Sequence, residues 1–204
     1  MPITHQVSLN KDLSYCIWKI EETEAELLSL LNLNSVELAD FERTKVPEKR
    51  LEWLCARNAL KQLVQPYGQF FLFKDNFGKP HLDSGDWQVS MSHAKGYGAA
   101  AIQKGKPLGI DIEIERQQIE RIAKKFLHEE EKTWLNHSVT DLTKIWGAKE
   151  ALYKLHGRTQ LIFAEELLVH PFEKGKGEII EDGKKDTFNL NFDKHNSLHI
   201  CLAY

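Results

Sequence analysis

The sequence lacks long apolar runs, an excess of basic residues and a leader segment. Its longest apolar stretches, such as Tyr97–Ile102, are far shorter than the roughly 18 residues that a membrane-spanning helix needs. The first residues show no basic region followed by an apolar one, so we expect no signal peptide. The 27 Lys and Arg against 30 Asp and Glu give a formal net charge of −3, which disfavours a general nucleic-acid binder because no basic surplus neutralises phosphates. We therefore expect no membrane association and no nucleic-acid partner.

Cysteine is scarce and scattered. Cys16, Cys55 and Cys201 are odd in number and form no closely spaced pair of the kind that binds a metal. They are typical of buried or free thiols in a reducing compartment, and we expect a cytoplasmic protein.

The length of 204 residues fits one large domain or two small ones, with enough chain for an adequate core. A polar loop over Gln103–Pro107 follows a strand rich in small residues. We place a boundary there and expect an N-terminal half over residues 1–104 and a C-terminal half over residues 105–204.

The segment Gly109–Glu115 alternates isoleucine with acidic residues, which is the side-chain period of a β-strand. Asp111, Glu113 and Glu115 should therefore share one face of that strand. Such a row of like charges is destabilising unless water screens it or a cation binds there. For an arbitrary sequence the screened, solvated edge is the commoner of the two.

A second acidic segment follows about forty residues later. Apolar residues recur there at intervals of three and four, and this predicts an amphipathic helix over roughly residues 141–156 that ends at Gly157. Lys149 falls within the apolar stripe, whereas Glu150 and Lys154 share a face with Gly147. One interpretation is a surface ion pair, with the Lys149 ammonium extending to water. The other is a carboxylate flanked by Lys149 and Lys154 that faces a phosphate-bearing ligand.

The acidic residues of the two segments are hard oxygen donors. Asp111, Glu113 and Glu150 include no nitrogen or sulfur ligand, and such a set suits Mg²⁺, or Mn²⁺, rather than Zn²⁺. Mg²⁺ that is held by few carboxylates usually completes its shell with water and substrate phosphates. The pattern therefore indicates a phosphate-ester ligand, and it names neither the nucleotide nor the acceptor.

The run Gly-Ile-Asp-Ile-Glu, followed by Trp-Gly-Ala-Lys-Glu-Ala-Leu-Tyr-Lys, resembles the two signature motifs of the 4′-phosphopantetheinyl transferases. The length resembles the larger, surfactin-synthetase-activating type, in which two similar halves lie in one chain. The resemblance implies transfer of the 4′-phosphopantetheine arm of coenzyme A to a serine of an acyl or peptidyl carrier protein. Adenosine 3′,5′-bisphosphate would be released. Such enzymes serve fatty acid, polyketide or nonribosomal peptide biosynthesis.

Roles in the C-terminal half follow from the resemblance. Asp111, Glu113 and Glu150 would hold Mg²⁺ against the pyrophosphate, and Glu150 would also take the proton from the acceptor serine. Lys154 would contact coenzyme A and stabilise charge on the breaking pyrophosphate. A serine hydroxyl is a poor nucleophile at neutral pH, so both a base and a neutralised electrophile are needed.

Roles in the N-terminal half concern the nucleotide end of coenzyme A. The residues that the resemblance implies there are Arg50, Arg57, Lys79, Ser92 and His93. Arg57 matches the family position for the 3′-phosphate better than Arg50 does. Lys79 belongs to a Gly-Lys-Pro turn, and the Ser92–His93 pair ends a strand. A hydrolase reading of that pair is disfavoured, because adjacent strand residues point to opposite faces and no nucleophile elbow surrounds them.

The fold class expected is α+β, with two similar halves that each pack a small antiparallel-rich sheet against helices. The resemblance implies an active site between the halves and a monomer with an internal pseudo-two-fold axis. Locally, we expect a strand over Leu13–Ile20, a helix opening at Pro47, a polar connector over Phe41–Lys45, a buried strand over Phe70–Phe73 and another strand over Leu161–Phe163.

Two other classes of function stay open. A Mg²⁺-dependent phosphodiesterase or nuclease could use an acidic strand and a Glu–Lys helix, although the acidic charge balance disfavours it. A non-catalytic carrier-protein or nucleotide-binding module is the other class, and the intact Asp111, Glu150 and Lys154 disfavour it. For the carrier protein, which is acidic near its serine, a candidate docking patch is Lys124, Lys125 and Phe126.

Overall fold

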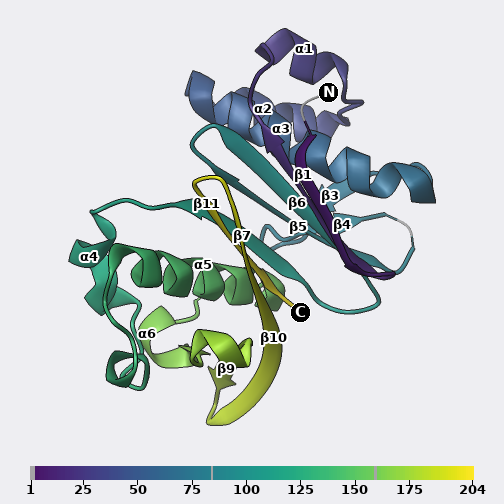
Figure 1. Cartoon of the computed structure of the whole chain (residues 1–204). Coiled ribbons are helices and arrows are strands. Elements are labelled where there is room, and N and C mark those ends of the chain that lie inside the picture. The colour runs from purple at the N-terminus through teal and green to yellow at the C-terminus, as the bar shows by residue number, and fades with distance from the viewer. Residues whose placement is uncertain (1–2, 84, 159) are drawn as a thin grey trace. The chain divides into compact units, whose positions relative to one another are not determined.

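The computed structural model describes residues 3–83, 85–158 and 160–204. The chain forms two compact units, Met1–Pro107 and Leu108–Tyr204, and each contains helices packed on an antiparallel sheet (Figure 1). The expected α+β class with two similar halves is confirmed. Met1 and Pro2, which open the segment without a signal-peptide pattern, lie outside the described residues.

The N-terminal unit is built on a six-stranded sheet of order β1-β2-β6-β5-β4-β3. Every pair of neighbouring strands in it is antiparallel. The strands are β1 (Ile3–Asn10), β2 (Leu13–Lys19), β3 (Leu72–Lys74), β4 (Pro80–Leu82), β5 (Trp87–Ala94) and β6 (Tyr97–Lys104). The helices are α1 (Glu24–Ser29), α2 (Ser35–Arg43), α3 (Pro47–Val64) and the short 3-10 turn η1 (Gln65–Tyr67).

Helix α3 covers the sheet of this unit and packs on β2, β5 and β6. Its apolar side chains join Trp18 and Ile102 of the sheet in one buried cluster. The closest approach is at Gly98 of β6, where an added Cβ would lie 2.2 Å from the backbone N of Ala56. Glycine is therefore required there for the helix to lie against the strand.

The C-terminal unit is built on a five-stranded antiparallel sheet of order β7-β11-β10-β9-β8. Its strands are β7 (Gly109–Ile114), β8 (Leu167–Val169), β9 (Lys176–Glu181), β10 (Lys184–His195) and β11 (Leu198–Ala203). Its helices are α4 (Ile119–Ile122), α5 (Val139–His156) and α6 (Phe163–Glu166), with 3-10 turns η2 (Ala123–Lys125), η3 (Glu131–Thr133) and η4 (Phe172–Lys174).

Helix α5 lies across β7 and β11, and it is the counterpart of α3 (Figure 1). A Cβ added at Gly109 of β7 would lie 1.8 Å from the carbonyl oxygen of Ala151. The strand can meet the helix so closely only because this residue has no side chain. Gly157 ends α5 with φ of 77°, as the sequence predicts for a C-terminal glycine.

The two units repeat one arrangement. When the edge strand β1 is set aside, the order β2-β6-β5-β4-β3 matches β7-β11-β10-β9-β8 strand for strand. Helices α3 and α5 both have 18 residues. Four buried residues of α3 recur in α5 at the same spacing: Ala56, Ala59, Leu60 and Leu63 match Ala148, Ala151, Leu152 and Leu155. Only a few identities survive, which is why the repeat is faint in the sequence.

Several local expectations were wrong. The polar connector over Phe41–Lys45 is largely the end of α2, and Leu161–Phe163 is not a strand, because α6 begins at Phe163. In the segment Phe70–Phe73, Phe71 and Phe73 are 61% and 47% exposed. By contrast, the strand from Leu13, the helix from Pro47 and the buried, free state of all three cysteines are confirmed.

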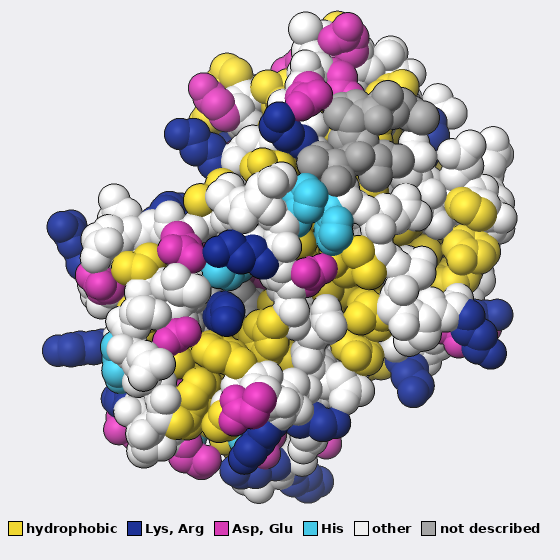
Figure 2. Space-filling view, viewed as in Figure 1, with side chains coloured by type: hydrophobic (Ala, Val, Ile, Leu, Met, Phe, Trp, Pro, Cys, Tyr) yellow, Lys and Arg dark blue, Asp and Glu magenta, His cyan; other side chains and the backbone are white. Residues whose placement is uncertain are grey.

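Charge is distributed over the surface. On the face shown in Figure 2, lysine and arginine side chains are interspersed with acidic and polar ones rather than gathered into one basic area. Within the described ranges, none of the helices combines the length and the hydropathy that crossing a bilayer requires.

Candidate active site

The acidic strand and the second acidic segment meet in the C-terminal unit. Asp111 lies on the face of β7 that packs against α5, the face that also carries Gly109. The Lys154 ammonium donates to Asp111 Oδ1 at 2.8 Å and to the carbonyl oxygen of Ile110 at 3.1 Å. The strand and helix are therefore joined by an ion pair between two of the predicted site residues.

Helix α5 passes the Asp111 carboxylate at Gly147. A Cβ added there would lie 3.6 Å from Asp111 Oδ2, which is ordinary van der Waals contact. Glycine thus keeps the helix surface beside that oxygen clear of side-chain atoms. This confirms that Gly147 shares the helix face that the Glu150–Lys154 spacing predicts.

Glu113 is held in place by two donors. The indole Nε1 of Trp146 donates to Glu113 Oε1 at 2.9 Å, and Arg116 Nη2 donates to Oε2 at 3.1 Å. Burial raises the pKa of Glu113, and the Asp111 carboxylate raises it further. Sequence reasoning gave Trp146 a place in the second motif and in the apolar stripe of the helix, and no hydrogen-bonding role. The signal that it missed is the indole N–H, since a partly buried tryptophan usually finds an acceptor.

Glu150 lies in the same cluster. Burial raises its pKa from 4.5 to about 7, and the charges of Asp111 and Glu113 raise it too, whereas Lys154 lowers it. Two acids from β7 and one from α5 are therefore close enough to interact electrically, as their spacing predicts. A carboxyl with a pKa near 7 is suited to accept a proton at neutral pH.

The donor set fits a hard divalent cation by its chemistry. All the acids of the cluster offer oxygen, and their mutual repulsion is what a bound cation would relieve. Their side chains are not already arranged as a cage, because among the described residues no three His, Cys, Asp or Glu side chains form a group that could hold a metal ion. The Lys154 ammonium contacts Asp111 instead. Mg²⁺ therefore stays a prediction for Asp111, Glu113 and Glu150.

Replacement of Glu150 by glutamine is expected to stabilise the metal-free protein above pH 7. A carboxyl whose pKa is raised from 4.5 to about 7 in the folded state stabilises the fold fully below 4.5, and loses that contribution as pH rises through 7. Glutamine stays neutral, so the variant should gain about 1 to 3 kcal/mol at high pH and little at low pH. Thermal melts in a chelator over a pH series measure this. A variant that is no more stable at high pH would mean that burial and the neighbouring carboxylates do not raise the pKa of Glu150.

Lys149 lies in the core, and both interpretations of it were wrong. Its side chain is fully buried, and its ammonium lies 2.9 Å from Glu131 Oε2. It also donates to the carbonyl oxygens of Phe126 and Phe163 at 2.6 and 2.8 Å. The ammonium therefore neither reaches water nor faces a ligand. The position of Lys149 in the apolar stripe directs its side chain into the core. The buried carboxylate of Glu131 lies there and neutralises the ammonium.

In the N-terminal unit, the predicted residues His93 and Ser92 end β5. His93 Nδ1 lies 3.0 Å from Glu52 Oε2, and the same carboxylate accepts from Lys49 at 2.6 Å. Glu52 is almost fully buried on α3, so it fixes the orientation of the half-exposed His93 ring. Ser92 is buried rather than solvent-facing. Sequence reasoning missed Glu52, although its position four and eight residues before the apolar Ala56 and Leu60 is a usable signal of a buried carboxylate.

The two predicted arginines have separate partners. Arg50 forms a bidentate pair with Glu24 at 2.7 Å for each bond, and donates to two backbone carbonyls. Arg57 Nε lies 3.3 Å from Glu37 Oε1, and its guanidinium stacks 3.1 Å from the centroid of the Trp53 ring. The structure thus assigns each arginine a contact within its own unit.

Arg57 is also the counterpart of Lys149 in the repeat. Each follows the first matched alanine of its helix, and each is buried and paired with a carboxylate that precedes the helix in the chain, Glu37 or Glu131. The phosphate contact predicted for Arg57 stays a prediction, because the repeat alone explains a buried cation there.

Lys79 lies in the turn between β3 and β4. Its backbone N–H donates to Asp75 Oδ1 at 3.0 Å, and Asp75 also accepts from the His81 ring at 3.0 Å. Burial lowers the pKa of Lys79, and Asp75 partly opposes this. The Gly-Lys-Pro turn is therefore closed by one aspartate.

Comparison with known proteins agrees with the motifs on β7 and α5. Residues 107–203 match the family model of the 4′-phosphopantetheinyl transferase superfamily. This range covers nearly all of the C-terminal unit and just under half of the chain, and the matched family is the one that the motifs resemble. A curated relative, 4′-phosphopantetheinyl transferase gsp of Aneurinibacillus migulanus, is 33% identical over 115 residues. That alignment covers 53% of this chain and 48% of the relative, so the match spans about half of each protein.

Proposed function

We propose that the protein transfers the 4′-phosphopantetheine arm of coenzyme A to a serine of an acyl or peptidyl carrier protein. The observation that carries the proposal is the meeting of Asp111, Glu113, Glu150 and Lys154 on β7 and α5. These residues lie within the range that matches the transferase superfamily. The name of the relative is consistent with the same activity.

In this proposal Glu150 is the base. Its pKa near 7 lets the carboxylate accept the serine proton at neutral pH. The serine oxygen then bonds to the pantetheine-bearing phosphorus, and the bond to the bridging pyrophosphate oxygen breaks. Adenosine 3′,5′-bisphosphate leaves with that oxygen. Lys154 lies near the negative charge that develops on the leaving phosphate and stabilises it.

Asp111, Glu113 and Glu150 would hold Mg²⁺ or Mn²⁺. The bound cation would supply charge neutralisation at the pyrophosphate. Trp146 and Arg116 support this assignment, because they fix the Glu113 carboxylate from the side and restrict its rotation. Supporting contacts of this kind orient metal ligands.

For the nucleotide end of coenzyme A we propose Lys79, Ser92 and His93, with Arg50 and Arg57 as further contacts. The Glu52–His93 contact supports the role of His93, since it holds the ring at the end of β5. For either arginine, binding of a phosphate would compete with Glu24 or Glu37.

The test is incubation of the full chain with coenzyme A, Mg²⁺ and a panel of apo carrier proteins, read by intact mass. A carrier that gains the mass of phosphopantetheine supports the transferase. Release of nucleotide fragments from DNA or RNA would favour a phosphodiesterase or nuclease instead. Binding of coenzyme A or carrier without any mass gain would indicate a non-catalytic module.

The docking patch predicted for the carrier protein needs one correction. Phe126 is 1% exposed and belongs to the core of the C-terminal unit, so it is not available to a partner. Lys124 and Lys125 are exposed on η2, and the adjacent Ile122 is 38% exposed. The surface that remains is basic with one apolar residue.

Charge reversal at Lys124 and Lys125 is expected to raise the KM for carrier protein about tenfold and to leave the affinity for coenzyme A unchanged. The reason is that complementary charge at the rim of an interface mainly steers association. Steady-state kinetics with the carrier as varied substrate measure the effect. Lys184→Glu, at an exposed end of β10, is the matched control. An unchanged KM would remove this patch from the docking surface.

A further inference from the structure

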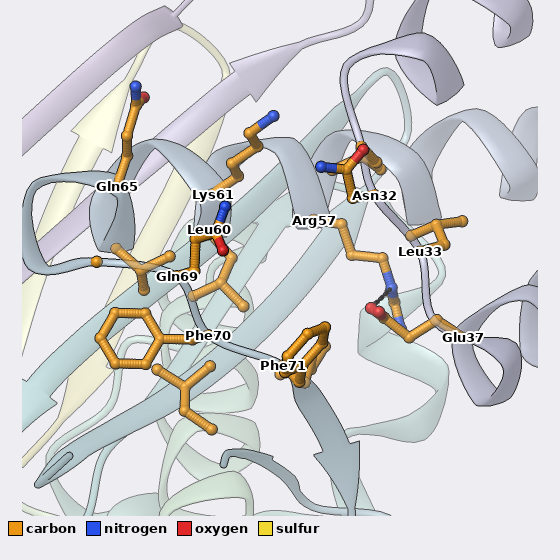
Figure 3. A pocket seen from close by; sticks show the side chains of 15 residues that line it. Asn32, Leu33, Glu37, Arg57, Leu60, Lys61, Gln65, Gln69, Phe70 and Phe71 are labelled. Carbon is orange, nitrogen blue, oxygen red and sulfur yellow. Dashed lines mark ion pairs between the residues drawn. The ribbon is translucent and has the colours of Figure 1, made fainter. Parts of the chain in front are cut away.

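The N-terminal unit contains a cavity of about 430 Å³ beside α3. It lies between α3, the loop after α1, the start of α2 and residues 68–72 (Figure 3). Its volume falls in the range of small-molecule pockets, which is about 300 to 1,000 Å³. Of the predicted coenzyme A residues, Arg57 lines it, whereas Arg50, Lys79, Ser92 and His93 do not.

One wall of the cavity carries the Arg57–Glu37 pair (Figure 3). The two side chains are only 7% and 13% exposed. Burial lowers the pKa of Arg57 to about 10 and raises that of Glu37, and each group opposes the shift of the other. Trp53 covers one face of the guanidinium. The N–H donors of the Arg57 guanidinium thus lie beside the Glu37 carboxylate, which is an acceptor, and both groups are largely shielded from water.

This wall carries one charge of each sign, and it therefore disfavours ligands with a net charge. An anionic ligand would meet Glu37, with Asp40 also close enough to act on Arg57, and a cationic ligand would meet Arg57. A neutral group satisfies both residues only if an acceptor and a donor are adjacent, as in an amide. The pair neutralises itself, and Lys61, the other charged residue of the lining, is exposed and donates to the carbonyl oxygen of Leu30. A neutral ligand therefore brings no uncompensated charge against the buried pair.

The other walls carry apolar and aromatic side chains, together with the exposed side chains of Asn32, Lys61, Gln65 and Gln69. Leu60 of α3 lines the cavity together with Phe70 and Phe71, and all three are labelled in Figure 3. Flat rings bury much area against such side chains at little conformational cost. The body of the ligand should therefore be a ring system rather than a flexible polar chain.

We propose that this cavity binds a flat, uncharged heterocycle with a lactam edge. The ring carbonyl accepts from the Arg57 guanidinium, and the adjacent ring N–H donates to the Glu37 carboxylate. The ring packs against Leu60, Phe70 and Phe71. This site goes beyond the transferase function proposed above, and Arg57 is the residue that it shares with the proposed coenzyme A contacts.

The probe is carbostyril, a bicyclic lactam, titrated into the full chain by calorimetry or ligand-observed NMR. Its N-methyl derivative has the same rings and carbonyl and lacks the N–H donor. We expect carbostyril to bind about tenfold or more tightly, because the derivative leaves a buried carboxylate without its hydrogen bond. Equal affinity of the two compounds, or no binding of carbostyril at about 1 mM, would overturn the proposal.

Two variants locate the binding. Leu33→Trp, at the half-buried edge of the cavity, should abolish carbostyril binding by filling the space. Leu38→Trp, at an exposed position of α2 outside the lining, is the matched control and should bind normally. Glu37→Gln should reduce the preference for carbostyril over its N-methyl derivative. Circular dichroism verifies that each variant is folded. Unchanged binding by folded Leu33→Trp would place the ligand elsewhere and refute the assignment.

The experiment is separable from the transferase proposal. Leu33 is in neither the predicted metal set nor the predicted coenzyme A set. At saturating coenzyme A, where a weaker Arg57 contact would not limit the rate, a folded Leu33→Trp variant should therefore transfer phosphopantetheine at the wild-type rate in the intact-mass assay. This expectation holds whether or not carbostyril binds.

Discussion

Glu150→Gln is expected to lower kcat by about 10² to 10⁴, the usual contribution of a positioned general base. Glutamine keeps the size and one oxygen donor of the residue, but loses the negative charge and nearly all basicity. Asp111 and Glu113 remain to anchor a cation, so the affinity for coenzyme A at high Mg²⁺ should change much less than kcat. Single-turnover rates at saturating coenzyme A and carrier protein measure the chemical step.

The pH profile distinguishes a base from a simple ligand. Because burial and the neighbouring acids raise the pKa of Glu150 to about 7, the wild-type rate should rise with pH through that region, and bound cation should shift the rise to lower pH. The rise should be absent in Glu150→Gln. Asp141→Asn, in the first turn of the same helix, is the matched control and should keep the wild-type profile.

Varying the Mg²⁺ concentration tests whether Glu150 is only a metal ligand. If Glu150 only holds Mg²⁺, the variant has lost occupancy, and more Mg²⁺ should restore most of the rate. If Glu150 takes the proton, saturating Mg²⁺ should leave the deficit in place. A near-normal kcat for Glu150→Gln at moderate Mg²⁺ would refute its assignment as the base.

Lys149→Ala is expected to lower the free energy of unfolding by about 3 to 5 kcal/mol, the usual cost of breaking a buried ion pair by removing one partner. The substitution leaves the fully buried Glu131 carboxylate without its cation. It also leaves the carbonyls of Phe126 and Phe163 without their donor. Urea unfolding measures the loss, and hydrogen exchange of the α5 amides locates it in the C-terminal unit.

A matched control lies next to this pair. Lys132 pairs with Glu129 on the surface, where both side chains are exposed, so Lys132→Ala should cost no more than about 1 kcal/mol. The double variant Lys149→Met with Glu131→Leu removes both charges and should recover much of the stability. A stable Lys149→Ala protein with weakened coenzyme A affinity would instead restore the ligand-facing interpretation.

The two motif segments could be predicted because their signals are local. Isoleucine alternates with acidic residues over Gly109–Glu115, and this specifies a strand. Apolar residues recur every three or four positions up to Gly157, and this specifies a helix. Because β7 and α5 pack on each other through Gly109, the acids that share a face also share a site. The cluster of Asp111 and Glu150 therefore follows from residue spacing once the two elements are correct.

Other features could not be derived, for physical reasons. The partner of Lys149 is Glu131, which lies outside the helix and is brought to it only by tertiary packing. The prediction of a strand at Leu161–Phe163 was wrong, because an apolar run this short is too brief to show whether its periodicity is that of a strand or of a helix. Helix α2 could have been predicted, because Asn34 and Glu37 form a capping box at its start, as Thr23 and Glu26 do at the start of α1.

The sheet order of the C-terminal unit has a consequence for synthesis of the chain. The only strand that pairs with β7 among the described residues is β11, and the His199–Glu115 contact between their ends spans 84 positions. During translation the strand that carries Asp111 and Glu113 therefore emerges long before its partner exists. Unpaired strand edges are templates for aggregation, and charged side chains are one of the means by which proteins protect them. The carboxylates that we assign to the reaction thus also place charge on this unpaired strand until β11 is made.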